Sequence, residues 1–297
     1  MKRRQLSILS VAAIIFALAG FLLSAVDAQN ADSSAAREIS RIDREFSAMS
    51  LEKGIPAACV AYFADDGIAF APAAVNGKKY WSARKEFSGI LVWEPVFAVV
   101  SRAGDLGYTT GPWELKKKNG AGETAFGNYV TIWRNRGQWK IALDVGIDNS
   151  QPSEPPPALQ LMPIDATAAE RSQEEARRSL RKTEAAFSAR AGEDVGKAIV
   201  DFGAPELRVL RDKSFPAIGI TAAEVMLGSD HGKLVCDAAA TRLSSSGELS
   251  YTYGKYSEER GNITERGIYL NIWQVDLNGD WKLVLDLQKK LPFSKTQ

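Results

Sequence analysis

The feature that most constrains the fold is an internal repeat. GDLGYTTG (residues 104–111) recurs as GELSYTYG (247–254), and GQWKIALD (137–144) recurs as GDWKLVLD (279–286). GNYVTIW (127–133) recurs as GIYLNIW (267–273), and EFSA (45–48) recurs as AFSA (186–189). All four pairs keep the same order and lie 140 to 143 residues apart. The pattern predicts a tandem duplication of one domain.

The boundary between the copies is rich in proline. Residues 149–163 read NSQPSEPPPALQLMP and hold five of the 12 prolines in the chain of 297 residues. Proline cannot join a regular helix or a central strand, and proline-rich segments act as semi-rigid spacers. We therefore predict a first domain over residues 34–148, a linker over 149–165 and a second domain over 166–290. A surface loop packed on the first domain is the alternative to a linker.

Each copy shows helical patterns first and strand patterns afterwards, which is the order of an α+β fold. Over residues 34–52, Ile39, Ile42, Phe46 and Met49 recur every three or four positions and form one apolar helical face. Pro56 is placed to open a second helix. In the first copy, strands are predicted at 90–101, 106–117, 126–134 and 139–145. In the second copy, helices are predicted at 168–191 and 194–202, and strands at 233–244, 249–258, 267–275 and 281–287.

The N-terminus has the pattern of a signal peptide. Lys2, Arg3 and Arg4 precede an apolar run over residues 8–26, and small residues before Ala28 suit cleavage after that position. We expect residues 1–28 to be removed and the protein to be exported, either periplasmic or secreted. The run is also long enough to span a bilayer. An uncleaved membrane anchor is therefore the alternative, and membrane contact is expected only in that case.

Charge and composition exclude several classes of protein. The formal net charge is +1, whereas a dedicated nucleic-acid binder carries a strong basic excess. One histidine and two cysteines are too few for the usual zinc sites. We therefore expect no nucleic-acid partner, no metal and no cofactor. Cys59 and Cys236 fall in different copies, and we expect both to be free thiols.

Three segments of the first copy resemble the nuclear transport factor 2-like superfamily. They are AYFADDGIAFAP (61–72), GDLGYTTGPWE (104–114) and YVTIWRNRGQWKIALD (129–144), and the most similar branch is that of the SnoaL-like domains of unknown function. The resemblance implies that each copy is a curved antiparallel sheet packed on N-terminal helices. It also implies a cone whose interior holds a small apolar molecule. Members pair through the outer sheet face, so the resemblance implies an intramolecular pseudo-dimer.

The catalytic residues of the isomerases in this superfamily are missing here. The resemblance places their aspartate base at Ala71 and a second acid near Thr131, and neither residue can supply that chemistry. The one histidine, His231, lies in an Asp-His-Gly sequence typical of an exposed turn. The sequence therefore assigns no catalytic residue.

Aromatic and acidic residues shared by the two copies are the candidates for lining the cones. Tyr129, Thr131 and Trp133 alternate along one strand and therefore share one face. Such rings line ligand pockets, but they equally form cores or domain contacts. The candidates in the first copy are Trp93, Glu94, Tyr108, Tyr129, Thr131, Trp133 and Asp144. Those in the second copy are Asp237, Tyr251, Tyr269, Asn271, Trp273 and Asp286.

Our leading hypothesis is an exported protein that binds a small hydrophobic or amphipathic ligand in a cone-shaped pocket. An enzyme acting on a small lipophilic substrate, such as an isomerase, cyclase or hydrolase, is the second hypothesis. It requires a buried carboxylate within hydrogen-bond reach of another polar group inside one cone. A protein-interaction module is the third.

Overall fold

The computed structural model describes residues 34–84, 87–117, 123–162, 164, 171–229 and 232–291. The predicted leader and His231 lie outside these residues, so both stay predictions. Among the described residues, no helix is both long enough and apolar enough to cross a membrane.

The first domain packs its helices on one face of a curved sheet. A helix over residues 34–53 is followed by α2 (Ile55–Tyr62), β1 (Phe63–Phe70), β2 (Ala74–Asn76) and α3 (Gly77–Ser82). The remaining strands are β3 (Gly89–Trp93), β4 (Phe97–Val100), β5 (Leu106–Lys117), β6 (Ala125–Asn135), β7 (Trp139–Asn149) and β8 (Gln160–Met162). Their order is β2-β1-β7-β6-β5-β4-β8, and β3 also pairs with β5.

The second domain repeats this plan. It consists of α4 (Gln173–Ala191), α5 (Val195–Phe202), β9 (Gly203–Arg211), β10 (Ala217–Ile218) and α6 (Ile220–Leu227), followed by four long strands. These strands are β11 (Lys233–Leu243), β12 (Leu249–Arg260), β13 (Ile263–Val275) and β14 (Trp281–Lys290). The sheet order is β10-β9-β14-β13-β12-β11. The α+β class and the two tandem domains agree with the sequence analysis.

Three details differ from the predicted elements. Both sheets are mixed, because β1 pairs in parallel with β7 and β9 pairs in parallel with β14. The single strand predicted at 90–101 is two strands, since Pro95 has no amide hydrogen to continue the ladder. The end of the predicted linker forms β8, which pairs in parallel with β4 and extends the first sheet.

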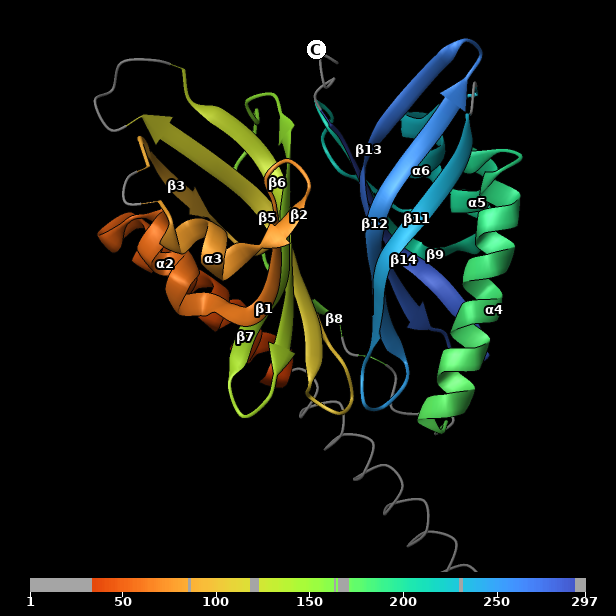
Figure 1. Cartoon of the computed structure of the whole chain (residues 1–297), viewed down its shortest axis with the longest axis horizontal. Helices are drawn as coiled ribbons and strands as arrows, with labels where there is room; N and C mark the ends of the chain where they lie inside the picture. Colours follow the sequence, from red (N-terminus) through yellow and green to blue (C-terminus); the bar gives the residue numbers. More distant parts are fainter. Residues whose placement is uncertain are drawn as a thin grey trace, which may run out of the picture.

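The two domains pack sheet against sheet. In Figure 1 the sheets face each other, with α2 and α3 outside the first and α4, α5 and α6 outside the second. Alternate residues of both sheets meet in one shared hydrophobic core, here called the interdomain core. Its members include Phe97, Val99, Leu106, Tyr108, Val130, Ile132, Leu210, Leu249, Tyr251, Ile268, Leu270 and Ile272.

Equivalent turns of the two domains also contact each other. The Arg102 amide donates to Glu248 Oε1 at 2.8 Å, and the Ser245 amide donates to Asp105 Oδ2 at 2.9 Å. Arg102 and Ser245 are repeat counterparts, as are Asp105 and Glu248. Reciprocal contacts of this kind define a two-fold interface. The chain therefore contains a pseudo-two-fold axis between its own halves.

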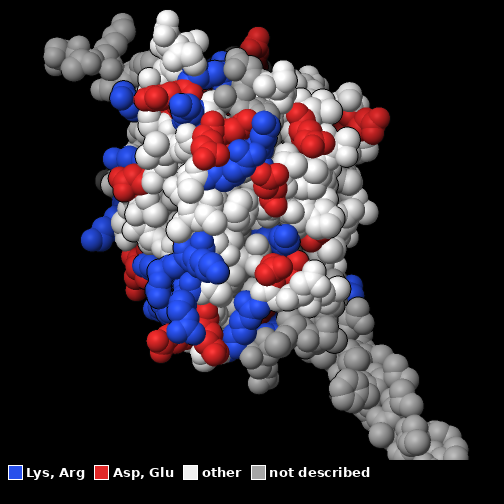
Figure 2. Space-filling model, turned by 90° about the vertical axis from the view of Figure 1, so that its right-hand side faces the viewer, with Lys and Arg blue, Asp and Glu red and all other residues white. Residues whose placement is uncertain are grey.

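The outer face of the second domain is polar. Figure 2 shows Lys and Arg side chains interspersed with Asp and Glu over the face that carries α4. The inner face of α4 instead packs Leu180, Phe187 and Ala191 into a core with Trp273 and Trp281. Each domain therefore buries two faces of its sheet, one under its own helices and one against the other domain.

Candidate ligand pocket in the first domain

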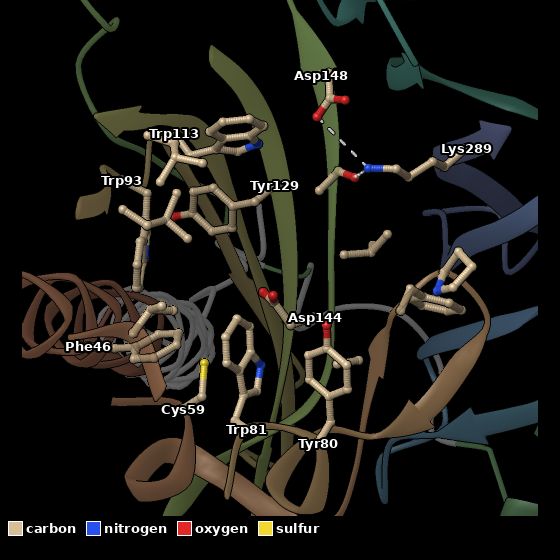
Figure 3. Close-up of a pocket in the computed structure, with 18 of the residues that line it drawn as sticks. Phe46, Cys59, Tyr80, Trp81, Trp93, Trp113, Tyr129, Asp144, Asp148 and Lys289 are labelled. Atoms are coloured by element: carbon tan, nitrogen blue, oxygen red, sulfur yellow. Dashed lines mark hydrogen bonds and ion pairs between the residues drawn. The ribbon is translucent and has the colours of Figure 1, made fainter. Parts of the chain in front are cut away.

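A pocket of about 320 Å³ lies between the helices and the sheet of the first domain. Figure 3 shows aromatic rings around this space and the carboxylate of Asp144, from β7, turned toward it. The wall is formed mostly by Phe46, Ile55, Cys59, Ala69, Phe70, Tyr80, Trp81, Leu91, Trp93, Trp113 and Tyr129. Its volume lies at the lower end of the range for small-molecule sites, and its lining has the mostly apolar character of such sites.

The second domain supplies part of the rim of this pocket. Lys289, Lys290 and Leu291, at the end of β14, join the lining. Lys289 Nζ donates to the carbonyl of Gly146 at 2.6 Å and lies 4.0 Å from Asp148 Oδ1, as drawn in Figure 3. The pocket of the first domain is therefore completed by the second domain.

Two acids border the pocket. Asp148 is exposed and lies beside Lys289, and the other acid is Asp144. Its side chain is half-buried, and Thr131 Oγ1 donates to Asp144 Oδ1 at 2.7 Å. Burial raises the pKa of Asp144 to about 6, the Thr131 hydrogen bond opposes this rise, and the nearby Asp43 adds to it. This carboxyl group therefore changes its charge close to neutral pH.

A second acid, Asp43, lies behind the wall on the helix over residues 34–53. It is fully buried and accepts hydrogen bonds from the Tyr129 hydroxyl at 2.6 Å and from Trp93 Nε1 at 2.7 Å. Burial raises the pKa of Asp43 to about 6, although the hydrogen bonds from Tyr129, Trp93 and Thr109 lower it. Asp43 thus fixes two aromatic residues of the pocket wall in place.

The candidates of the first copy separate into three groups. Trp93, Tyr129 and Asp144 line the pocket, and Thr131 and Trp133 lie beside it. Trp133 is fully buried, and its Nε1 donates to Thr109 Oγ1 at 2.8 Å.

The other two candidates lie elsewhere. Tyr108 belongs to the interdomain core, because it projects from the opposite face of β5 to Thr109. Glu94 lies outside the pocket, and its half-exposed side chain pairs with Arg44 at 2.7 Å.

The second domain has a smaller pocket, of about 240 Å³. Tyr269, Asn271 and Trp273 line it, whereas Tyr251 lies in the interdomain core and Asp237 is exposed on the edge strand β11.

Asp286, the counterpart of Asp144, does not line this smaller pocket. It is buried in an ion pair with Arg211. The Asn271 amide, with its nitrogen turned toward Asp286, donates to Oδ2 at 3.0 Å. Arg211 and Asn271 therefore already bind the carboxylate of Asp286.

Sequence reasoning missed Asp43 and its counterpart Glu184, which differ in number by the same 141 residues as the EFSA and AFSA segments. Glu184 lines the smaller pocket and accepts a hydrogen bond from Thr252, the counterpart of Thr109. An acid between Ile39 and Phe46 on the apolar face of the helix was the signal available in the sequence. Phe46, Cys59, Tyr80, Trp81 and Trp113 were also missed as pocket residues.

The described residues offer no metal site, since no three His, Cys, Asp or Glu side chains cluster among them. Both cysteines are free. Burial, followed by the nearby Asp144, raises the pKa of Cys59 well above its ordinary value. Cys59 therefore lines the pocket as a neutral thiol rather than as a reactive thiolate.

No family model matches the sequence, and no curated protein matches it. Several solved structures do match. An NTF-2 like protein of unknown function from Shewanella oneidensis MR-1 is 11% identical with a TM-score of 0.32, and the match covers 38% of this chain and 98% of that one. An NTF2-like protein with a cystatin-like fold from Novosphingobium aromaticivorans is 14% identical with a TM-score of 0.33, and the match covers 41% of this chain and 86% of that one.

A nuclear transport factor 2 (NTF2-like) superfamily protein from Salmonella enterica is 12% identical with a TM-score of 0.34, and the match covers 41% of this chain and 96% of that one. Each of these matches covers about 40% of this chain and most of the matched protein.

Proposed function

We propose that the first domain binds a small, mainly apolar molecule that carries one hydroxyl or amino group, with that group hydrogen-bonded to Asp144. The observation that carries the proposal is the position of this carboxyl group, which borders a pocket walled by aromatic and aliphatic side chains. Among the described residues it accepts a side-chain hydrogen bond only from Thr131. A carboxylate has room for further donors, so a ligand group can complete its hydrogen bonding.

Asp43 and Asp144 support a neutral or basic ligand, because Lys289 and Lys290 at the rim already lie beside Asp148 and Glu265. Asp43 raises the pKa of Asp144, so the two acids together favour a proton or a positive charge at this point. Asp43 itself is held by protein donors and does not border the pocket. Asp148, the other acid of the lining, lies beside Lys289 at the rim. Asp144 is therefore the acid available to a ligand, while Asp43 orients Tyr129 and Trp93 around it.

The test is calorimetric titration of the purified protein with 2-phenylethylamine and 2-phenylethanol. We expect saturable binding of the amine, and a loss of at least tenfold in affinity in Asp144→Asn. Asp237→Asn is the control, because this acid is exposed and lies outside both pockets. The proposal is contradicted if neither probe binds saturably, or if the wild type and Asp144→Asn bind the amine with equal affinity.

Acid–base catalysis on such a molecule is the second candidate. Asp144 lies 2.7 Å from the Thr131 hydroxyl inside one cone, which is the arrangement that the enzyme hypothesis requires. A carboxyl with a pKa of about 6 also suits proton transfer near neutral pH. Native mass spectrometry of the protein from its own host distinguishes the two candidates. A retained, unchanged molecule favours binding, and conversion of that molecule on incubation favours catalysis.

A further inference from the structure

A second pocket, of about 490 Å³, lies where the two domains and the linker meet. It is separate from the pocket of the first domain and shares no lining residue with that pocket. One wall is the proline-rich segment over residues 152–157, and another is formed by Phe215, Pro216 and Ile218 of the second domain. Phe215 and Ile218 are half exposed, so the pocket opens to solvent past apolar side chains.

Arg208, on β9, brings a positive charge into this apolar surrounding. Its side chain lines the pocket although the residue is only 6% exposed, and its Nε has no hydrogen-bond partner among the described residues. The guanidinium carbon lies 3.8 Å from the centroid of the Phe97 ring, and Nη2 makes one long hydrogen bond, of 3.4 Å, to Gln160 Oε1. Burial lowers the pKa of Arg208.

The charge of Arg208 is not balanced by an ion pair. None of the described carboxylates lies within 4.0 Å of its guanidinium, whereas Arg211, also on β9, pairs with Asp286. Glu206, two residues earlier on the strand, contributes only through its longer-range field. A buried charge without a partner is costly. Because this unpaired guanidinium lies at the wall of a pocket, we infer that an anionic group from outside the chain pairs with it.

We propose that this interdomain pocket binds a small organic carboxylate with an apolar body. The carboxylate pairs with the Arg208 guanidinium, which presents two parallel donors to such a group. The apolar body packs on the linker prolines and Phe215. A single guanidinium matches a single negative charge, and the exposed Glu154 in the pocket lining opposes a doubly charged ligand. The proposal does not depend on the ligand of the first-domain cone.

Benzoate is the probe, and benzamide is its neutral isostere. By titration calorimetry we expect saturable binding of benzoate to the full-length protein and at least tenfold weaker binding of benzamide. Arg208→Met removes the charge but keeps an unbranched apolar side chain of similar length. We expect it to weaken benzoate binding at least tenfold and to leave the unliganded Tm equal to or above that of the wild type.

Two controls locate the site. Arg242→Gln removes an exposed arginine of the same domain and should leave the affinity for benzoate unchanged. Asp237→Asn removes an exposed acid that does not line this pocket and should also leave it unchanged. Arg208→Lys keeps the charge without the paired donors and should give an intermediate affinity. Equal affinities of the wild type and Arg208→Met, or no saturable binding of benzoate at millimolar concentrations, would overturn the proposal.

Discussion

At the scale of single residues, Asp43 and Asp144 of the first domain differ in how their charge is balanced. Asp43 is surrounded by the hydroxyl and indole donors of Tyr129, Trp93 and Thr109, so its ionised form is stabilised by the protein itself. Asp144 has the Thr131 hydroxyl and borders the pocket. An ionised group that the fold leaves partly unsatisfied costs stability. In the unliganded protein, the ionised form of Asp144 is therefore less stabilised than the ionised form of Asp43.

Asp144→Asn should therefore stabilise the unliganded protein at high pH. The pKa of Asp144 rises from 3.8 to about 6 on folding, so the folded state holds a proton more tightly than the unfolded state. The contribution of Asp144 to the free energy of unfolding accordingly falls as the pH rises from about 4 to about 6 and then levels off. We expect Asp144→Asn to gain about 1 to 3 kcal/mol at pH 8 and to lose part of this slope. Urea unfolding at a series of pH values measures both the gain at pH 8 and the pH dependence of the free energy of unfolding. An unchanged pH profile would show that Asp144 is not desolvated.

Tyr129→Phe should destabilise the protein in a pH-dependent way. The Tyr129 hydroxyl stabilises the ionised form of Asp43, which predominates above pH 6. Loss of this hydrogen bond should cost about 1 to 2 kcal/mol at pH 8 and less at pH 5, where Asp43 is protonated. Tyr108→Phe is the matched control, since none of the described carboxylates accepts a hydrogen bond from that buried hydroxyl. Equal costs at both pH values for Tyr129→Phe would argue against the link to Asp43.

At the scale of elements, the repeat and the long alternating strands predicted the architecture. They did not predict which face of each strand lies against the helices and which lies against the other domain. The prediction 106–117 coincides with β5, and the helix pattern around Ile39 was correct. β1 and β9 were not recognised, because charged residues and Gly67 or Pro205 interrupt their apolar pattern.

Alternation alone could not tell the cone from the domain interface, because both faces of each sheet are buried. Tyr108 and Tyr251 were therefore placed in the cones, whereas Thr109 and Thr252 are the residues of β5 and β12 that face the helices. Asp43 was overlooked since a buried acid on an apolar helix face interrupts the pattern that identifies that face.

The start of α4 offers a test at this scale. Ser172 accepts a hydrogen bond from the amide of Glu175, and the Ser172 amide donates to the Glu175 side chain, which together form a capping box. Ser172→Ala should lower the free energy of unfolding by about 1 kcal/mol. Ser188→Ala, in the exposed interior of the same helix, should be neutral or slightly stabilising, because alanine is the better helix former. Urea midpoints at unchanged m values measure the difference, and equal midpoints would contradict a capping role.

At the scale of the whole molecule, the interdomain core joins the stability of the two domains. Leu270, fully buried in β13, packs in this core with residues of the first sheet. We expect Leu270→Ala to cost about 2 to 5 kcal/mol and to lower the Tm of both domains together. Calorimetry should show a single transition whose calorimetric and van't Hoff enthalpies agree. Two separable transitions, with only one of them shifted, would show that the domains unfold independently.

The reciprocal packing of the two sheets also constrains how a gene for such a chain can change. A deletion that removed one repeat would leave the remaining sheet with an uncovered apolar face, and the product would have to pair with another copy of itself or aggregate. Deletion of the second repeat would also remove Lys289, Lys290 and Leu291 from the rim of the first-domain pocket. The two repeats are thus free to diverge where they line their own pockets, whereas a substitution on one facing sheet has to stay complementary to the other sheet of the same chain.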